Sequence, residues 1–388
     1  MKTETNCAQL LEIIPDELLE NLEKCTEVNH QVKKLTGKII FKLLLFSLLN
    51  SERLSLRVIE TFYNSKQFQI FSGKNDETTR HTTLSDRLIN INSDFFKKIF
   101  EYLSENFRES VYKGSNIRRF DSTLVSISSK LLKTGIQAGG VDEKKQMKYT
   151  VSLSGDFPDS VRICNTQQEV SEEIALRKAI LELEHDTNSI VVFDRGLQRR
   201  KTFCDFTDEG ILFVGRLKNR VDCKEVRKFK EVRGKKSKTL KFKKDMVVYF
   251  KGSKGELIKK ELRLITAISL KTGEELKFVT NITRLNAREI TDIYARRWDI
   301  EVFFRFIKQE LNFNHFISRN ENGIKVLLYM TLIASTLLLA YKKKNNISGY
   351  KIMKLRFTQE LEMEIIKEIV LLCNGDVSRM SLLNNASP

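Results

Sequence analysis

The sequence has few prolines and no apolar segment long enough to cross a membrane. Three prolines in 388 residues are few for flexible connections, and neither an internal repeat nor a low-complexity linker is present. The longest apolar run, residues 326–341, is interrupted by hydroxyl side chains and falls short of the ~20 residues that span a bilayer. Residues 1–7 are polar and lack the basic and then apolar layout of a signal peptide. We therefore expect no membrane partner and a buried helix at residues 326–341.

Cysteine and histidine occur without any spacing typical of a metal site. The six cysteines include no Cys-x-x-Cys pair, and the four histidines fall in no ligand pattern. These absences argue against structural zinc and against a disulfide framework, and they suit a reducing cytosol. We expect a cytoplasmic protein.

Basic residues outnumber acidic ones by 67 to 50, which gives a net charge of +17. The excess is concentrated between Arg216 and Arg263, where 19 Lys or Arg stand against 6 Asp or Glu; a merely soluble basic protein would need no such concentration. A basic surface attracts polyanions, so a nucleic acid and an acidic membrane are both candidate partners. Leu240 and Phe242 alternate with lysines, which is typical of hairpin strands rather than of a membrane-bound helix. Nucleic acid is therefore the expected partner.

The N-terminal part of the chain is predicted to be helical. With 388 residues and 41% hydrophobic side chains, the chain has room for two or three domains. Residues 1–110 carry apolar side chains at helical spacing and are expected to form a helical domain that binds DNA. Within it, residues 75–91 combine Arg80, Thr82 and Thr83 with a short helical piece, which fits either a DNA-reading helix-turn-helix or an ordinary surface helix. The expected helices of this domain are residues 10–22, 39–49, 54–62 and 95–103.

From about residue 115 the pattern changes to an alternation of strands and helices. The order strand, strand, strand, helix, strand, helix, strand fits an α/β fold with a ribonuclease-H-like sheet, and other α/β folds give similar strings. A long helix follows, whose start carries Asn286 and Glu289 as a capping pair. The expected strands are residues 117–127, 147–153, 161–164, 190–193, 211–214, 262–270 and 276–282, and the expected helices are residues 171–184, 286–311 and 357–372.

Two aspartates stand out from the other carboxylates by their context. Asp194 follows the apolar run 190–193 and should project from the carboxyl end of a buried strand, where open α/β sheets place their sites. Asp121 lies inside the first predicted strand, where a charge is costly without a partner. Either a cation or one of the arginines Arg118 and Arg119 is a candidate to neutralise it. Taken singly, each aspartate also fits a purely structural role.

The predicted helix 286–311 carries one polar and one apolar face. At ~100° per residue, the polar side chains fall within a narrow arc, which suits a nucleic-acid strand that crosses a metal site. A solvated face with an ion pair at i, i+4 between Arg297 and Glu301 is the alternative. The polar face comprises Tyr294, Arg297, Glu301 and Lys308, and the apolar face, expected to pack on the sheet, comprises Ile300, Phe303, Phe306 and Ile307.

The spacing of the polar face resembles a known family signature. Tyr-x2-Arg-x3-Glu-x6-Lys, at Tyr294, Arg297, Glu301 and Lys308, resembles the YREK signature of DDE transposases in insertion sequence family four. Residues 280–281 and 294–308 resemble the third catalytic region of that family, Phe193-Asp194-Arg195-Gly196 the second, and Phe120-Asp121-Ser122-Thr123 the first. The resemblance covers about residues 115–340. One departure is Leu197, where many relatives carry an aromatic residue at a position peripheral to the chemistry.

The resemblance implies a fold, a chemistry and a partner. The fold is a ribonuclease-H-like, retroviral-integrase-like core over residues 111–340, interrupted by a β-rich basic insertion at 217–275 and followed by a helical tail at 341–388. Asp121, Asp194 and Glu301 would hold two Mg²⁺ or Mn²⁺ ions, with Asp121 shared, for hydrolysis and strand transfer of DNA phosphodiesters. The implied partners are double-stranded DNA, both the terminal inverted repeats of the element and the target, and a second copy of the chain in the synaptic complex.

The remaining roles concern DNA contacts. Tyr294, Arg297 and Lys308 are expected to grip phosphates beside the scissile bond. Trp298, the only tryptophan, either stacks on an unpaired base or belongs to the core. Two other functions stay open: a non-catalytic DNA-binding relative, and a ribonuclease-H-like nuclease without strand transfer. Joined strands among the products would identify a transposase, and cleaved strands alone a nuclease.

Overall fold

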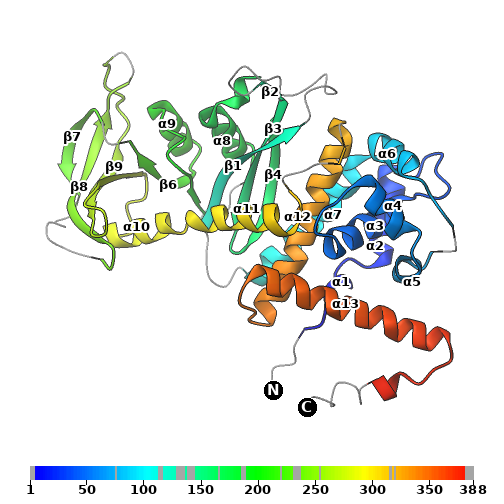
Figure 1. Cartoon of the computed structure of the whole chain (residues 1–388). Helices are drawn as coiled ribbons and strands as arrows, with labels where there is room; N and C mark the ends of the chain where they lie inside the picture. Colours follow the sequence, from blue (N-terminus) through cyan, green and yellow to red (C-terminus); the bar gives the residue numbers. More distant parts are fainter. Residues whose placement is uncertain are drawn as a thin grey trace. The chain divides into compact units, whose positions relative to one another are not determined.

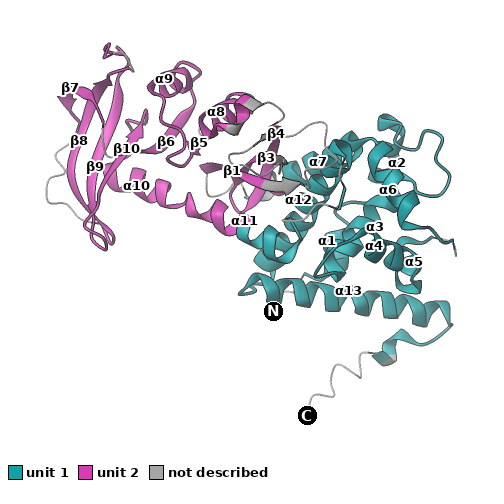
Figure 2. Cartoon of the chain, turned by 45° about the horizontal axis from the view of Figure 1, so that its top comes forward, with its two compact units in different colours: residues 1–106, 125–134, 305–388 teal, residues 107–124, 135–304 magenta. Residues whose placement is uncertain are grey.

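The protein is composed of two compact units, coloured separately in Figure 2. A computed structural model describes residues 5–74, 77–111, 117–127, 136–137, 145–164, 167–184, 189–218, 221–229, 237–252, 255–313, 317–318 and 320–380. The first unit comprises residues 1–106, 125–134 and 305–388, and the second comprises residues 107–124 and 135–304. The predicted domain boundaries near residues 110 and 340 stay predictions.

The first unit is helical (Figure 1). Thr36, Ser55 and Ser65 each begin a helix by accepting a backbone N–H with the side-chain hydroxyl. Its longest helix, α12, is apolar and long enough to cross a membrane, but 94% of its most apolar window is buried inside the structure, so the predicted buried helix at residues 326–341 is confirmed. The helices are α1 (Cys7–Leu11), α2 (Asp16–Thr26), α3 (Gly37–Asn50), α4 (Leu56–Tyr63), α5 (Lys66–Ser72), α6 (His81–Asn90), α7 (Ser93–Val111), α12 (Glu321–Lys344), α13 (Tyr350–Leu372) and the short η2 (Val377–Arg379).

The second unit is built on a ten-stranded mixed sheet. Its strand order is β2-β3-β1-β5-β6-β10-β9-β8-β7, with β4 beside β3. Strands β1, β5 and β6 pair in parallel. The pairs β2–β3, β3–β4, β6–β10, β10–β9, β9–β8 and β8–β7 are antiparallel. The order β1, β3, β4, α8, β5, α9, β6 is the one predicted from the sequence. The elements are β1 (Ile117–Ile127), β2 (Ile136–Gln137), β3 (Lys145–Ser154), β4 (Phe157–Cys164), η1 (Gln167–Val170), α8 (Glu172–Leu181), β5 (Ile190–Val192), α9 (Arg200–Asp208), β6 (Leu212–Leu217), β7 (Cys223–Lys228), β8 (Leu240–Phe250), β9 (Leu262–Ser269), β10 (Glu275–Thr280), α10 (Ala287–Ala295) and α11 (Trp298–Glu310), which continues into the first unit.

Strand alternation sorts the apolar side chains of the sheet onto two faces. Val191 and Phe193 pack with side chains of α8 and α9, whereas Ile190 and Val192 pack with side chains of α10. The centre of the sheet is therefore covered on both faces. This explains why residues 190–193 form an unbroken apolar run, as strands buried on both sides do.

The basic stretch 216–263 forms the outer antiparallel part of the sheet, and its residues 219–220, 230–236 and 253–254 lie outside the described residues. This part of the sheet contains a buried ion pair: Arg263 of β9 donates to both carboxylate oxygens of Asp245 on β8, at 2.8 and 2.7 Å. The same guanidinium donates to the backbone carbonyls of Ile282 and Leu285, which follow β10. A buried, fully bonded ion pair thus ties this part of the sheet to the segment that leads into α10.

Two helices that the sequence predicts as continuous are broken. Residues 10–22 form α1 and α2, separated just before Asp16 by Pro15, which has no backbone N–H to donate. Residues 286–311 form α10 and α11. At the break, the N–H groups of Arg297 and Ile300 donate three residues back, to Tyr294 and Arg297, so the chain winds more tightly than an α-helix. The single arc calculated for one helix therefore does not hold across Arg296 and Arg297.

Candidate active site

Asp121 lies on β1, and Asp194 follows the end of the neighbouring parallel strand β5 by two residues. In the register of β1 and β5, Arg119 lies opposite Val192. The same register continued by two residues brings Asp121 opposite Asp194. Because neighbouring strands lie ~4.8 Å apart, the two carboxyl groups share the carboxyl end of the sheet.

The pKa of Asp121 reflects its burial and the negative charge of the neighbouring carboxylates. Burial raises the pKa of Asp121 to about 7, and the negative charges of Asp194 and Glu172 contribute to the increase. The backbone N–H of Ser122 donates to Asp121 Oδ1 at 2.8 Å and the guanidinium of Arg297 lies within electrostatic reach, but both only oppose the increase. The site thus concentrates more negative charge than its own donors compensate.

Neither arginine beside Asp121 neutralises it. Arg118 forms an ion pair with Asp159 at 2.9 Å, and Arg119 forms one with Asp299 at 2.7 Å. Because side chains alternate along a strand, Arg118 points away from the face that carries Asp121, whereas Arg119 shares that face and reaches α11. The sequence offered either a cation or one of these arginines as the group that neutralises Asp121. Both arginines are paired with other carboxylates, so the cation is the candidate that is left.

Glu301 lies in the first turn of α11 and binds Arg297 at 2.6 Å, the i, i+4 ion pair considered from the sequence. Burial alone would lower the pKa of Arg297, but Glu301, Tyr294 and Asp121 together raise it. The guanidinium therefore lies within electrostatic reach of carboxylates on β1 and α11. Arg297 links the two parts of the site.

The other residues of the predicted polar face differ in exposure. Tyr294 packs edge-on against Phe278 of β10, with ring centroids 5.2 Å apart, and burial raises its pKa. Trp298 is 53% exposed and so does not belong to the core. Lys308 lies on the part of α11 that belongs to the first unit. The predicted apolar face is buried at all four positions, Ile300, Phe303, Phe306 and Ile307.

The sequence reasoning missed Glu172, the first residue of α8. Its Oε2 binds the buried ammonium group of Lys148 at 2.7 Å, while Oε1 is buried and has no hydrogen-bond partner among the described residues. A Cβ on Gly196 would lie 2.3 Å from Glu172 Cγ and 2.9 Å from Asp194 Oδ1, so only glycine permits this close approach. The available signal was the Glu-Glu pair at the start of the predicted helix 171–184.

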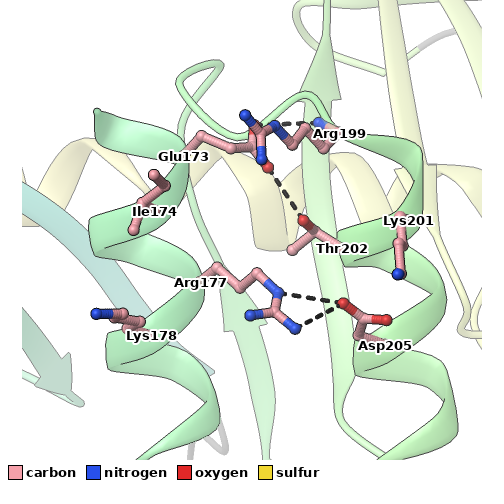
Figure 3. A pocket seen from close by; sticks show the side chains of 8 residues that line it. All are labelled: Glu173, Ile174, Arg177, Lys178, Arg199, Lys201, Thr202 and Asp205. Atoms are coloured by element: carbon pink, nitrogen blue, oxygen red, sulfur yellow. Dashed lines mark hydrogen bonds and ion pairs between the residues drawn. The ribbon is translucent and has the colours of Figure 1, made fainter. Parts of the chain in front are cut away.

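The loop that follows Asp194 is held by Glu173, the next residue of α8 (Figure 3). Its Oε2 accepts the backbone N–H groups of Gln198 and Arg199 at 2.5 and 3.1 Å, and its Oε1 accepts the hydroxyl of Thr202 at 3.1 Å. Glu173 thus supplies the cap of α9 that the side chain of Arg199 does not. The buried carboxylate lines a cavity of about 260 Å³ between α8 and α9.

The donors of the site suit a divalent cation in kind and in charge. They are carboxylate oxygens, the hard ligands that Mg²⁺ and Mn²⁺ prefer, and a bound cation would relieve the repulsion that raises the pKa of Asp121. Within the described part of the chain, no group of three or more such side chains is arranged to hold a metal ion. Glu301 would therefore have to exchange Arg297 for the ion.

Comparisons with known proteins identify the family of the chain. A family model described as "Transposase DDE domain" matches residues 114–337, more than half of the chain. A protein of Geobacillus stearothermophilus, named as a transposase for insertion sequence element IS5377, is 26% identical over 278 residues, which cover 69% of this chain and 70% of the relative. A Synechocystis protein, named as a transposase for element IS4SA, is 25% identical over 284 residues, which cover 71% of this chain and 75% of the relative.

A solved structure shares the fold. The chain is similar to the piggyBac transposase in a cryo-EM structure of its synaptic complex with hairpin DNA, with a TM-score of 0.52 and 12% sequence identity. The similarity covers 95% of this chain and 82% of the other. The chain therefore shares its mixed α/β architecture, with its large sheet, with that transposase. Leu197, the one departure noted in the sequence, is fully buried in the core beside α9.

Proposed function

Because this chain belongs to the family of transposases with a DDE domain, we propose that it moves an insertion sequence by cutting DNA at the ends of the element and joining the freed ends to target DNA. The observation that carries this proposal is the register of β1 and β5, which brings Asp121 opposite Asp194 beside the helix of Glu301. A structural ion pair would need one acid and one base, whereas this site gathers several acids.

In this proposal Asp121, Asp194 and Glu301 would hold two divalent ions, Mg²⁺ or Mn²⁺. Bound ions of this kind activate an attacking oxygen and stabilise a leaving oxygen. In the metal-free protein, the ion pair with Arg297 at 2.6 Å compensates the charge of Glu301. Metal binding would replace Arg297 as the partner of this carboxylate. When Glu301 leaves Arg297, the freed guanidinium can bind a DNA phosphate with two parallel hydrogen bonds.

The DNA contacts follow from charge and exposure. Trp298 presents an exposed ring beside Arg297, 6.0 Å from the guanidinium, and is available to stack on an unpaired base. Lys308 would bind a phosphate farther along the strand. Tyr294 is half-buried and packs edge-on against Phe278, so we assign to it a role in positioning Arg297, which lies within its electrostatic reach, rather than a phosphate contact of its own.

The wider organisation is proposed on the same basis. The sheet and its helices form a ribonuclease-H-like core, the basic strands between β6 and β10 are an insertion that contacts DNA, and the N-terminal helices bind DNA as well. Two copies of the chain pair the two terminal inverted repeats before cutting, in the cytoplasm of a bacterium. Coordinated cutting of both ends protects the donor DNA.

The test compares wild type with Glu301→Ala on a duplex that carries an end of the element, with Mg²⁺ or Mn²⁺ present. Gln309→Ala, an exposed position on the same helix, is the control. We expect wild type and control to nick and join DNA, and Glu301→Ala to bind DNA but to lose more than ~100-fold in rate, since loss of a metal ligand exceeds the 10–100-fold cost of an outer-shell residue. Cleavage without joining would favour a nuclease. Binding without cleavage by every variant would favour a non-catalytic DNA-binding protein.

A further inference from the structure

Arg119 is a buried cation that lies two residues before Asp121 on β1. Its side chain is completely inaccessible to solvent, and a buried charge is costly unless it is paired and hydrogen-bonded. The guanidinium donates to Asp299 Oδ2 at 2.7 Å and to the backbone carbonyl of Gly155 in the turn between β3 and β4. Such a residue is not needed to fill the core, where an apolar side chain would serve.

The partner of Arg119 lies two residues before Glu301. Asp299 is in the first turn of α11 and also accepts a hydrogen bond from Arg296 Nε at 3.0 Å. Side-chain alternation places Arg119 and Asp121 on one face of β1, the face that also carries Ile117 toward α10. The ion pair therefore crosses from the strand of one proposed metal ligand to the helix of another, and both of its ends lie two residues from those ligands.

We propose that the ion pair of Arg119 with Asp299 is a positioning device that fixes Glu301 relative to Asp121, an inference that rests on the proposed function. Among the described residues, the ion pair that Glu301 forms is with Arg297 on its own chain segment, and Arg297 reaches Asp121 of the sheet electrostatically, without a direct ion pair. The break between α10 and α11 removes the regular α-helical hydrogen bonds that would otherwise align this segment. Ile300 is also buried in this turn, but apolar packing has no fixed direction, so the hydrogen-bonded contact with Arg119 is the directional one that ties the first turn of α11 to β1.

The geometry also argues against a role in simple charge balance. Asp299 is 45% exposed and already has Arg296 beside it, so it needs no buried partner to remain charged. Arg119, in contrast, has an Nε with no hydrogen-bond partner among the described residues, so the fold accepts an incomplete set of bonds to keep this guanidinium in place. A misplacement of ~1 Å at a reacting centre can cost ~100-fold in rate, which gives a reason to retain it.

The test uses Asp299→Ala and Asp299→Asn, because Asp299 is partly exposed and its variants are expected to fold. Asn keeps one acceptor oxygen for Arg119 but removes the charge. The matched control is Asp292→Ala on α10, which breaks an exposed ion pair with Arg288 at 3.7 Å. Four quantities are measured for each: Mn²⁺ affinity, the rate of cleavage at saturating Mn²⁺, DNA affinity without metal, and the unfolding midpoint.

For Asp299→Ala we expect Mn²⁺ affinity or the cleavage rate to fall ~10–100-fold, as for other outer-shell residues, with DNA affinity equal to that of the control. Its unfolding midpoint should fall as well, because the variant leaves the buried Arg119 without its charged partner, so all variants are compared at a temperature well below their unfolding midpoints. Asp299→Asn should fall between wild type and Ala. Arg119→Lys keeps the charge but cannot donate to Asp299 and to the Gly155 carbonyl from two separate nitrogens. It should lose part of the Mn²⁺ affinity or of the cleavage rate. Metal affinity and cleavage equal to the control would overturn the inference, and so would a loss explained entirely by reduced thermal stability. If wild type does not cleave DNA at all, the proposed function fails, whereas the Mn²⁺ affinities still decide the role of the ion pair.

Discussion

At the scale of single residues, the site is defined by repulsion between carboxylates. Asp121 has its pKa raised to about 7 by burial and by Asp194 and Glu172, although its oxygen accepts a backbone N–H. A carboxyl group whose pKa is raised by folding stabilises the folded state while it is protonated. That contribution is complete below the ordinary pKa of 3.8 and is lost as the pH rises through about 7. Ionised Asp121 should therefore lower the stability of the metal-free protein at pH values above about 7.

Replacing Asp121 with Asn should stabilise the metal-free protein at pH 8 and abolish cleavage. Asn has the same shape and keeps an acceptor for the Ser122 N–H, but it carries no charge to repel Asp194. Because one pKa unit corresponds to 1.36 kcal/mol, the gain is at most ~4 kcal/mol at pH 8 and vanishes near pH 4. Urea unfolding with a chelator at several pH values measures it. An equal gain for Asp222→Asn, which only removes an exposed partner of Lys251, would contradict this explanation.

At the scale of elements, contacts between elements distant in sequence hold the segments that carry the proposed catalytic side chains. Glu173 of α8 caps α9 and holds the loop that follows Asp194. Gly196 allows α8 to approach that loop. The proposed ion pair of Arg119 with Asp299 does the same for α11. These contacts explain why α8, which carries no residue of the YREK spacing, still belongs to the site.

Glu173→Ala should destabilise the protein by about 2–4 kcal/mol, because it leaves buried donors of Gln198, Arg199 and Thr202 without an acceptor. Asp205→Ala is the matched control in the same cavity. It removes the partner of Arg177, whose side chain is 42% exposed, so we expect a cost below ~1 kcal/mol. Denaturant unfolding of both variants gives the difference. Equal costs would mean that the cap of α9 contributes no more than a surface ion pair.

At the scale of the whole molecule, the uneven charge is carried by the outer strands of the sheet. Exposed lysines without an ion-pair partner among the described residues lie on β7 and β8, and include Lys241 and Lys244. The buried pair of Arg263 with Asp245 keeps these strands attached to the segment that leads into α10. A basic surface fixed in this way suits contacts with a DNA backbone.

The double variant Lys241→Gln/Lys244→Gln should weaken DNA binding and lower its dependence on salt. Each lost phosphate contact reduces the slope of log affinity against log salt by about 0.9, so a reduction of up to ~2 is expected. Lys344→Gln/Lys351→Gln changes the net charge equally at the end of α12 and the start of α13. Salt titrations of DNA affinity compare the two variants. A similar loss in both would indicate an effect of net charge rather than a surface contact.

The sequence alone predicted the order of the main strands and helices from β1 to β6, apart from the short β2 and η1, because alternation, buried apolar runs and capping residues are local signals. It also indicated Asp121, Asp194 and Glu301, through strand context and a spacing within one segment. The partners of these residues were decided by tertiary structure. Arg119 pairs with Asp299, 180 positions away, Glu172 approaches Asp194 only because Gly196 lacks a side chain, and the long helix breaks at Arg296 and Arg297. Such contacts depend on which faces of distant elements meet, and no periodicity within one element encodes that.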